Sequence, residues 1–163
     1  MSSRVEQMRE RFARSAFHTA WLGLSLDHVD EGEATVSIAV EPKHRNLMGT
    51  LHGGMISTLA DTATGVAMGT TLEDGTTWTT TALNVTFLAP GRSGRVRAVG
   101  RVVKRGKTFG YAEADVVDDD GRLLARATAT FAILPERRED ASDAEARFGP
   151  GPVSSVGDDG AIE

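Results

Sequence analysis

The sequence predicts an α+β domain in which a curved antiparallel sheet wraps around one long central helix. The first observation is the segment 54–70, where apolar residues surround most of the helical circumference. A helix of this kind is buried, so it needs a sheet that curves around it. The second observation is that the chain after Gly75 is rich in threonine and β-branched residues over four consecutive segments. A helix segregated from a meander of strands is the α+β arrangement.

The elements on either side of the central helix follow from local patterns. A capping box at Ser3 and Glu6, followed by apolar residues at helical spacing, predicts a helix over about 4–16. Residues 19–30 are expected to form a loop that leads into a short strand. The segment 33–42 alternates in polarity and ends in a proline, which predicts a half-buried strand. The four later strands are expected at residues 76–90, 94–106, 107–119 and 121–134, the last after the hairpin dipeptide Asp120–Gly121.

Composition predicts one domain over residues 1–135 and a separate tail over 136–163. The tail holds eight acidic and three basic residues, so it carries the whole net charge of −5 and leaves the domain neutral. Its low apolar content predicts disorder, with an interaction segment as the alternative. The 163 residues include no cysteine, no signal-like apolar region and no apolar run long enough to span a membrane. We therefore expect a cytoplasmic protein with no membrane partner.

The start of the central helix carries polar groups in an unusual place. Residues 46–69 include Asn46, His52, the pair Gly53–Gly54 and, within the apolar part, Asp61. A buried carboxylate needs a partner, a raised pKa or a wet cleft beside it. One explanation is a structural hydrogen bond to a hydroxyl one turn earlier, from Ser57 or Thr58. The other is a carboxylate that acts as nucleophile or general base.

Several motifs together resemble the hotdog-fold thioesterases of the PaaI-like branch. They are Asn46, Gly49, HGG at 52–54, LAD at 59–61, Gly65, LNVTFLAPG at 83–91, Arg105–Gly106 and DGRLLARATATF, which starts at Asp120. The resemblance covers roughly residues 20–134. It implies a hotdog fold, hydrolysis of acyl-CoA thioesters, and a homodimer or a dimer of dimers. It also implies that neither a metal nor a redox cofactor is used.

The polar residues of the motif are expected to have separate roles. Asp61 is expected to attack the thioester carbonyl, directly or through a water. The Gly53 N–H, free at a helix N-terminus, is expected to polarise that carbonyl, and Gly54 lets substrate approach the backbone. His52 is expected to support the loop or bind substrate, and Asn46 to orient the water or hold the loop. Thr80 falls where related enzymes keep a hydroxyl beside the nucleophile.

The spacing of the motif predicts that two chains build each site. On a single helix, His52 and Asp61 would be about 13 Å apart and roughly half a turn around the axis from each other. They would then face opposite ways and could not serve one carbonyl. We therefore expect Asp61 of one subunit to lie opposite the loop 46–53 of its partner.

The remaining site residues are expected to bind the substrate. Residues 92–107 hold seven basic residues and no acid, but the segment is a predicted hairpin without interleaved aromatics, which disfavours nucleic acid. Its turn resembles the family's phosphate-facing turn, so we expect Lys104, Arg105, Gly106 and Lys107 to contact CoA phosphates. The acyl group is expected near Met55, Met68 and Trp78.

Two other hotdog functions compete with that of an acyl-CoA thioesterase. A non-catalytic acyl-CoA-binding hotdog domain would lack the carboxylate that Asp61 supplies. A hotdog dehydratase or hydratase would need a histidine paired with an acid, which the HGG and LAD placement fits less well. A metal site is disfavoured because the histidines lack metal-binding spacing; they are His18, His28, His44 and His52.

Overall fold

A computed structural model describes residues 3–136 of the chain, and the expected tail at 137–163 lies outside the described residues. The helices are α1 (Arg4–Arg14) and α2 (Gly53–Thr70), with a π-helical turn at Phe17–Trp21 and a 3-10 turn at Pro42–His44. The strands are β1 (Leu24–Asp30), β2 (Glu33–Ala39), β3 (Thr76–Phe87), β4 (Arg95–Arg105), β5 (Phe109–Val117) and β6 (Leu123–Pro135).

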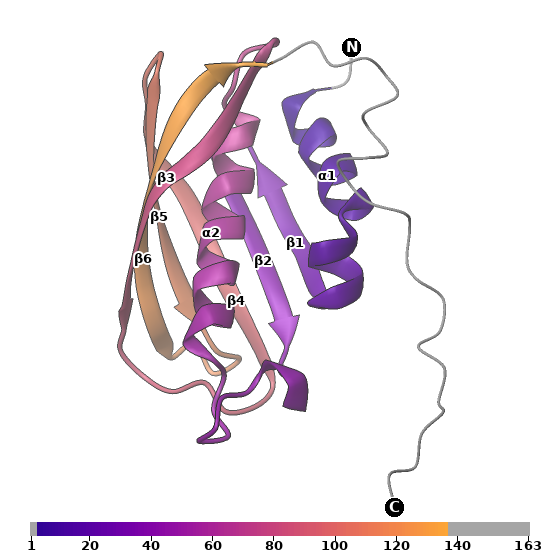
Figure 1. Cartoon of the computed structure of the whole chain (residues 1–163), viewed down its shortest axis with the longest axis vertical. Coiled ribbons are helices and arrows are strands. Elements are labelled where there is room, and N and C mark those ends of the chain that lie inside the picture. Colours follow the sequence, from indigo (N-terminus) through magenta and orange to yellow (C-terminus); the bar gives the residue numbers. More distant parts are fainter. Residues whose placement is uncertain (1–2, 137–163) are drawn as a thin grey trace, which may run out of the picture.

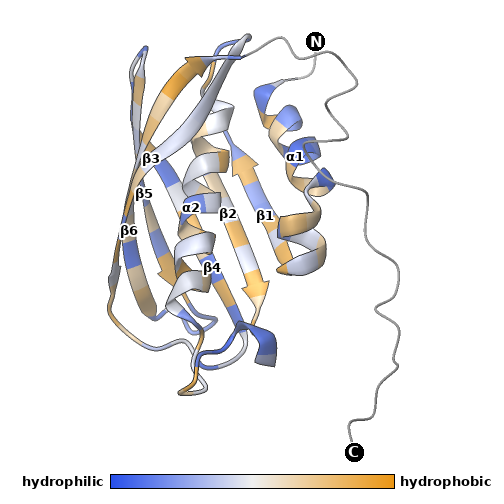
Figure 2. Ribbon diagram, viewed as in Figure 1, coloured by the Kyte–Doolittle hydropathy of each residue, from blue (hydrophilic) through white to orange (hydrophobic). Residues whose placement is uncertain are grey.

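The six strands form one antiparallel sheet in the order β1-β2-β4-β5-β6-β3. Figure 1 shows this sheet curving around α2, with α1 beside β1 at one side of the helix. Polar and apolar residues alternate along β5 (Figure 2), and its buried positions also alternate, as expected for a strand with one face on a core. The predicted α+β fold with a wrapped central helix is confirmed.

The central helix packs closest against the middle of the sheet. Leu59, Ala60 and Ala63 of α2 have no exposed surface. A Cβ added to Gly100 of β4 would lie 2.6 Å from the backbone carbonyl carbon of Ala63. Only glycine lets the helix and strand backbones approach this closely. The small residues of α2 therefore set how tightly the sheet wraps it.

An irregularity in β3 decides which of its side chains face α2. The pairing with β6 shifts register between Thr80 and Ala82, so Thr81 is an extra residue of a β-bulge. Before the bulge, Trp78 and Thr80 line a cavity against α2. After the bulge, the odd-numbered residues point inward in place of the even-numbered ones, and Leu83 and Val85 pack on the core. A bulge re-aims side chains in this way next to many functional sites.

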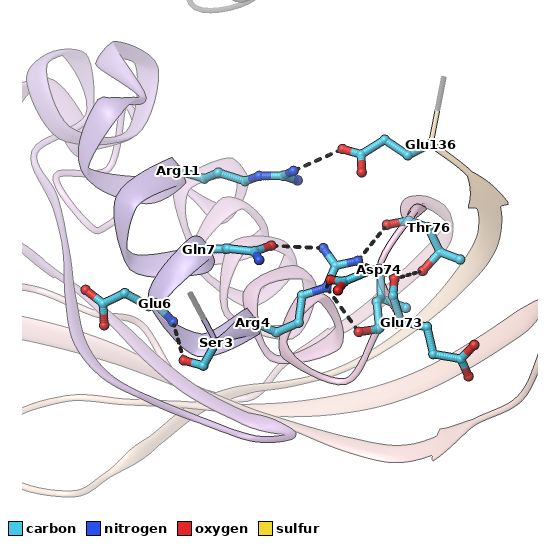
Figure 3. Close-up of polar contacts among 10 residues, drawn as sticks. Ser3, Arg4, Glu6, Gln7, Arg11, Glu73, Asp74, Thr76 and Glu136 are labelled. Carbon is cyan, nitrogen blue, oxygen red and sulfur yellow. Dashed lines mark hydrogen bonds and ion pairs between the residues drawn. The ribbon is translucent and has the colours of Figure 1, made fainter. Parts of the chain in front are cut away.

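Helix α1 is held to the rest of the domain by two arginines (Figure 3). Arg4 donates hydrogen bonds to the backbone carbonyls of Leu72 (3.1 Å), Thr76 (3.3 Å) and Glu73, just beyond the end of α2. Arg11 pairs with Glu136 at 3.0 Å. Glu136, predicted to begin the tail, therefore still contacts the domain. These contacts fix α1 as a wall beside α2.

Two predicted boundaries differ from the structure. Helix α1 ends at Arg14, two residues before the expected end. Residues 17–21, partly expected as a loop, form the π-helical turn. The turn has a physical basis in the hydrogen bond from the Leu22 N–H to the Phe17 carbonyl, five residues back. The turn carries His18.

Candidate active site

The loop before α2 is built around one asparagine. The Asn46 Oδ1 accepts hydrogen bonds from the backbone N–H groups of Met48 (3.0 Å) and Thr50 (3.1 Å). Its Nδ2 donates to the Thr50 Oγ1 at 2.9 Å. Gly49, at φ +74°, makes the sharp turn that brings these groups together. Of the two roles predicted for Asn46, these contacts match the holding of the loop.

His52 caps the N-terminus of α2. Its Nδ1 accepts a hydrogen bond from the Gly54 N–H at 2.8 Å, and its carbonyl accepts from Met55 and Ile56. Among the described residues, the Gly53 N–H has no hydrogen-bond acceptor. One backbone donor is thus left free at the positive end of the helix dipole. His52 thus supports the helix start, and its Nδ1 is occupied by the cap hydrogen bond.

A cavity of about 360 Å³ opens beside this helix start. The aromatic ring of Phe87 covers one side of Gly53, because a Cβ added there would lie 3.2 Å from the ring. The cavity is lined by Asn46, Thr50, Leu51, Gly53, Ile56, Phe87, Leu88, Ala89 and Pro90.

Asp61 lies two turns further along α2 and takes its partner from the sheet. The Thr80 hydroxyl of β3 donates to the Asp61 Oδ1 at 2.9 Å. The hydroxyls of Ser57 and Thr58 donate instead to the carbonyls of Gly53 and Gly54. The hydroxyl bonded to Asp61 therefore comes from β3 and not from the preceding turn of α2. The placement of Thr80 beside the carboxylate agrees with the prediction for that residue.

The Asp61 carboxylate faces a second cavity, of about 270 Å³, between α1, α2 and β3. Apolar side chains make up much of its wall, and Asp61 is half-buried there. The lining residues are Met8, Arg11, Phe12, Ser15, His18, Asp61, Thr62, Gly65, Val66, Trp78 and Thr80.

Two glycines of α2 shape this second cavity differently. A Cβ added to Gly69 would lie 2.7 Å from the Trp78 ring and would also strike Met8, so the glycine lets both side chains press on the helix. A Cβ added to Gly65 would lie 3.4 Å from the Trp78 Nε1, an ordinary contact. Gly65 itself lines the cavity, so the volume that a side chain would fill at this position belongs to the cavity.

The two cavities share no lining residue. Helix α2 begins at Gly53, so Gly53 and Asp61 lie on one helix and are separated by about 12 Å along its axis. Within one chain, the free N–H and the carboxylate therefore belong to different cavities. This is the geometry from which the sequence predicted a site made by two chains.

The predicted substrate-binding residues are more scattered. Trp78 lines the Asp61 cavity, but Met68 is fully buried in a core cluster with Phe131 and lines neither cavity. Met55 is half-buried and packs on the main core. The position of Met68 corrects the expectation that it borders an acyl site beside Trp78. The reason is that Gly110 of β5 admits the Met68 side chain into the sheet.

The basic turn between β4 and β5 lies near the other end of α2. Arg105 pairs with Glu73 of the α2–β3 connection at 3.2 Å. Its Nε is buried and has no hydrogen-bond partner among the described residues. The Gly106 N–H donates to the Phe109 carbonyl and closes the turn, while Lys104 and Lys107 are exposed.

Comparison with known proteins places this architecture in a family. The model of the thioesterase superfamily matches residues 48–125. Acyl-coenzyme A thioesterase 13 of Homo sapiens is 32% identical over 101 residues, which cover 61% of this chain and 71% of the human protein. The chain belongs to the thioesterase superfamily. It is a thioester hydrolase.

Solved structures agree with this assignment of the thioesterase. A thioesterase family protein from Silicibacter pomeroyi superposes with a TM-score of 0.77 at 30% identity, covering 82% of this chain and 99% of that one. The PaaI protein of E. coli, from the phenylacetic acid degradation operon, superposes with a TM-score of 0.75 at 25% identity, over 82% and 95% of the two chains. The predicted hotdog fold and PaaI-like resemblance are confirmed.

Ser15 and His18 are among the residues of the thioesterase's Asp61 cavity that were not predicted as site residues. The Ser15 Oγ and the His18 Nδ1 are 2.6 Å apart. Burial lowers the pKa of His18, while the neighbouring Asp61 carboxylate acts in the opposite direction. Both residues lie outside the motif, and no spacing pattern in the N-terminal segment connects them to Asp61.

Two other kinds of site are absent from residues 3–136 of this thioesterase. That part of the chain contains no cluster of three or more His, Asp or Glu side chains able to hold a metal ion. It also contains no helix that is both long and apolar enough to cross a membrane.

Proposed function

We propose that this thioesterase hydrolyses acyl-CoA thioesters to a free acid and CoA, with Asp61 as nucleophile or as general base on water. The observation that carries the proposal is the Asp61 carboxylate, held through one oxygen by Thr80 at the wall of a largely apolar cavity. The name of the human relative, an acyl-coenzyme A thioesterase, supports a CoA ester as the substrate.

The carbonyl of the thioester binds the Gly53 N–H of a second subunit. That donor is free, lies at a helix N-terminus and opens on its own cavity, so it can stabilise a developing oxyanion. Because the two cavities are separate within one chain, the proposed site combines Asp61 of one subunit with the partner's Gly53. The functional unit is a homodimer, alone or within a dimer of dimers.

The free edge of β3 offers a geometry for this dimer. Strand β3 is the last strand of the sheet, so only one of its edges is paired. If two β3 strands paired antiparallel about an axis between Leu83 and Asn84, each Thr80 would lie opposite the partner's Phe87. Thr80 borders the Asp61 cavity and Phe87 borders the Gly53 cavity. Such a pairing would bring the two half-sites together.

The substrate then spans two regions. An aromatic or medium-chain acyl group fits the Asp61 cavity, where Phe12 and Trp78 offer apolar surface. The CoA phosphates contact the turn 104–107, where Lys104 and Lys107 are exposed and Arg105 pairs with Glu73. Arg105→Ala should raise KM for CoA esters several-fold with little change in kcat, measured by steady-state kinetics. An equal loss on a thioester without the nucleotide part would contradict the phosphate role.

The first experiment tests the carboxylate. Thiol release from benzoyl-, phenylacetyl- and medium-chain acyl-CoAs is followed with a thiol reagent, which reports only CoA because the protein has no cysteine. Asp61→Asn keeps the shape of the side chain and should lower kcat at least a hundredfold. Asp120→Asn, in the exposed turn before β6, is the matched control and should leave kcat unchanged. Wild-type rates in Asp61→Asn, or no release from any ester by the wild type, would overturn the proposal.

The second experiment tests the sharing of the site between chains. Asp61→Asn is mixed with Gly53→Pro, which removes the backbone N–H, by unfolding the two variants together and refolding them. In a mixed dimer one site keeps both Asp61 and the Gly53 N–H, so about a quarter of wild-type activity should return at equal amounts. If each chain carried a complete site, every chain in the mixture would remain inactive. No recovery despite mixed dimers in native mass spectra would contradict the two-chain site.

A further inference from the structure

The side chain of His18 is held firmly at the wall of the Asp61 cavity. Its ring stacks on Phe12, with ring centroids 5.6 Å apart, and meets the edge of Phe17 at 5.2 Å. Its Nδ1 is 2.6 Å from the Ser15 Oγ. Three contacts thus fix one imidazole beside the carboxylate proposed to carry out the reaction.

The unused hydrogen-bonding atoms of this cavity form a matched pair. Among residues 3–136, the His18 Nε2 has no hydrogen-bond partner, and neither has the second carboxylate oxygen of Asp61. A neutral imidazole that donates its Nδ1–H to Ser15 presents an accepting lone pair at Nε2. The cavity therefore offers two free acceptors, one from the π-helical turn and one from α2.

A water between two acceptors is oriented for attack. Both of its protons are engaged, so a lone pair of its oxygen is left to face a third direction, where a thioester carbonyl carbon can approach. With a donor in place of either acceptor, that lone pair would be used in a hydrogen bond. The chemical state of His18 therefore decides whether such a water is reactive.

The charges around His18 favour its neutral form at neutral pH. The ionisable residues that line the cavity with it are Arg11 from α1 and Asp61 from α2; the lining residues from β3, Trp78 and Thr80, carry no charge. Arg11 is paired with Glu136. Burial lowers the pKa of His18, which outweighs the opposite effect of Asp61.

We propose that His18, held by Ser15, is a water-positioning residue for thioester hydrolysis. Its Nε2 and the free oxygen of Asp61 each accept a hydrogen bond from the attacking water. The inference rests on the proposed function with Asp61 as general base. The water oxygen bonds to the carbonyl carbon while one proton passes to Asp61. The carbon–sulfur bond then breaks, and the same proton passes from Asp61 to the departing CoA sulfur.

Substitution of His18 tests this role by kinetics. His18→Phe keeps an aromatic ring among Phe12 and Phe17 but removes both nitrogens, and it should lower kcat about tenfold with little change in KM. His18→Gln restores an amide oxygen that can accept from water, so it should recover most of the loss. It cannot titrate, so the fall in kcat toward acidic pH should become shallower. His28→Gln, on the exposed face of β1, is the matched control and should leave both rate and pH profile unchanged.

Wild-type kcat and an unchanged acidic limb in His18→Phe would overturn the proposal. If His18→Phe does not fold, Ser15→Ala takes its place, because it leaves the imidazole in position but removes the partner of Nδ1. Ser15→Ala should also lower kcat, and a wild-type kcat in a folded Ser15→Ala protein would overturn the proposal.

Proton NMR gives a readout that does not depend on activity. The pKa of the His18 ring, measured in the wild type and in Asp61→Asn, should be lower in the variant, because the carboxylate that stabilises the imidazolium is gone. The C–H resonances of the exposed His28 ring should be the same in the wild type and the variant. An unchanged His18 pKa would overturn the shared-water role while the Asp61 kinetics still stood. A shifted His18 pKa together with no thioester hydrolysis by the wild type would sink the proposed function instead.

Discussion

The start and the middle of α2 present polar groups in opposite ways. At the start, the donor is the backbone N–H of Gly53. The side chain of Asn46 forms hydrogen bonds within the loop, and that of His52 caps the helix. In the middle, the acceptor is the side chain of Asp61, and its surroundings come from α1, α2 and β3. The first half-site is local in sequence, and the second is assembled from distant segments.

This difference shows where each half-site is vulnerable. The helix start depends on backbone geometry within about a dozen residues, so it should tolerate side-chain changes that leave the loop closed. The middle depends on side chains brought together by the packing of three elements, so single substitutions should change its chemistry. Substitutions at the two half-sites can separate dependence on the backbone from dependence on side chains.

Removal of the Gly53 N–H should have the largest effect. Proline suits the first position of a helix, and His52 already has an extended backbone (ψ 135°) that a following proline accepts. Gly53→Pro should therefore leave α2 intact while lowering kcat about a hundred- to a thousandfold, measured in the thiol-release assay.

Gly53→Ala is the matched control for this substitution. It introduces the same Cβ against the Phe87 ring but keeps the N–H. Its kcat should stay within a few-fold of wild type. Equal losses in the two variants would show that crowding of Phe87, rather than the missing donor, is responsible.

Loss of the hydroxyl beside Asp61 should have an intermediate effect. Thr80→Val removes the donor to the Asp61 Oδ1 and should lower kcat about tenfold, with less change in KM. Thr81→Val removes a neighbouring hydroxyl that donates to the Thr130 carbonyl instead, and it should leave kcat close to wild type. A larger kinetic effect in Thr81→Val would mean that the bulge, and not the hydrogen bond to Asp61, matters.

The smallest expected effect is on stability. Since burial lowers the pKa of His18 below its ordinary value of 6.5, the unfolded chain binds more protons than the folded chain just below that pH. The free energy of unfolding should therefore fall as the pH drops through about 6.5. In urea unfolding at several pH values, His18→Gln should flatten this slope and His28→Gln should not. The same slope in wild type and His18→Gln would contradict the assignment.

Much of the fold and one half-site could be predicted from the sequence, because their causes are local. The apolar circumference of residues 54–70 required a wrapped helix, and the Asp120–Gly121 dipeptide marked a hairpin. The loop from Asn46 to Gly53 forms its contacts within a few residues, so its motif was sufficient to suggest them. The spacing between His52 and Asp61 was also enough to show that these two residues lie far apart along one helix.

The missing parts depend on packing between distant segments. A bulge at Thr81 changes which side chains of β3 face α2, and nothing in the run of threonines marks the extra residue. His18 lines the same cavity as Asp61 only because α1 packs against α2 and the π-helical turn follows α1. Met68 looked like a cavity residue by its position on the helix, but the glycine that admits it to the core lies on β5.

Gly65 connects the stability of the protein with the size of molecule it can accept. Glycine inside a helix costs about 1 kcal/mol relative to alanine, so Gly65→Ala should strengthen α2. The added methyl group has room beside Trp78, but that room is part of the Asp61 cavity. A side chain at position 65 should therefore raise the thermal stability of the protein and fill part of the cavity. A form of this enzyme that becomes more heat-resistant in this way should accept a narrower range of substrates.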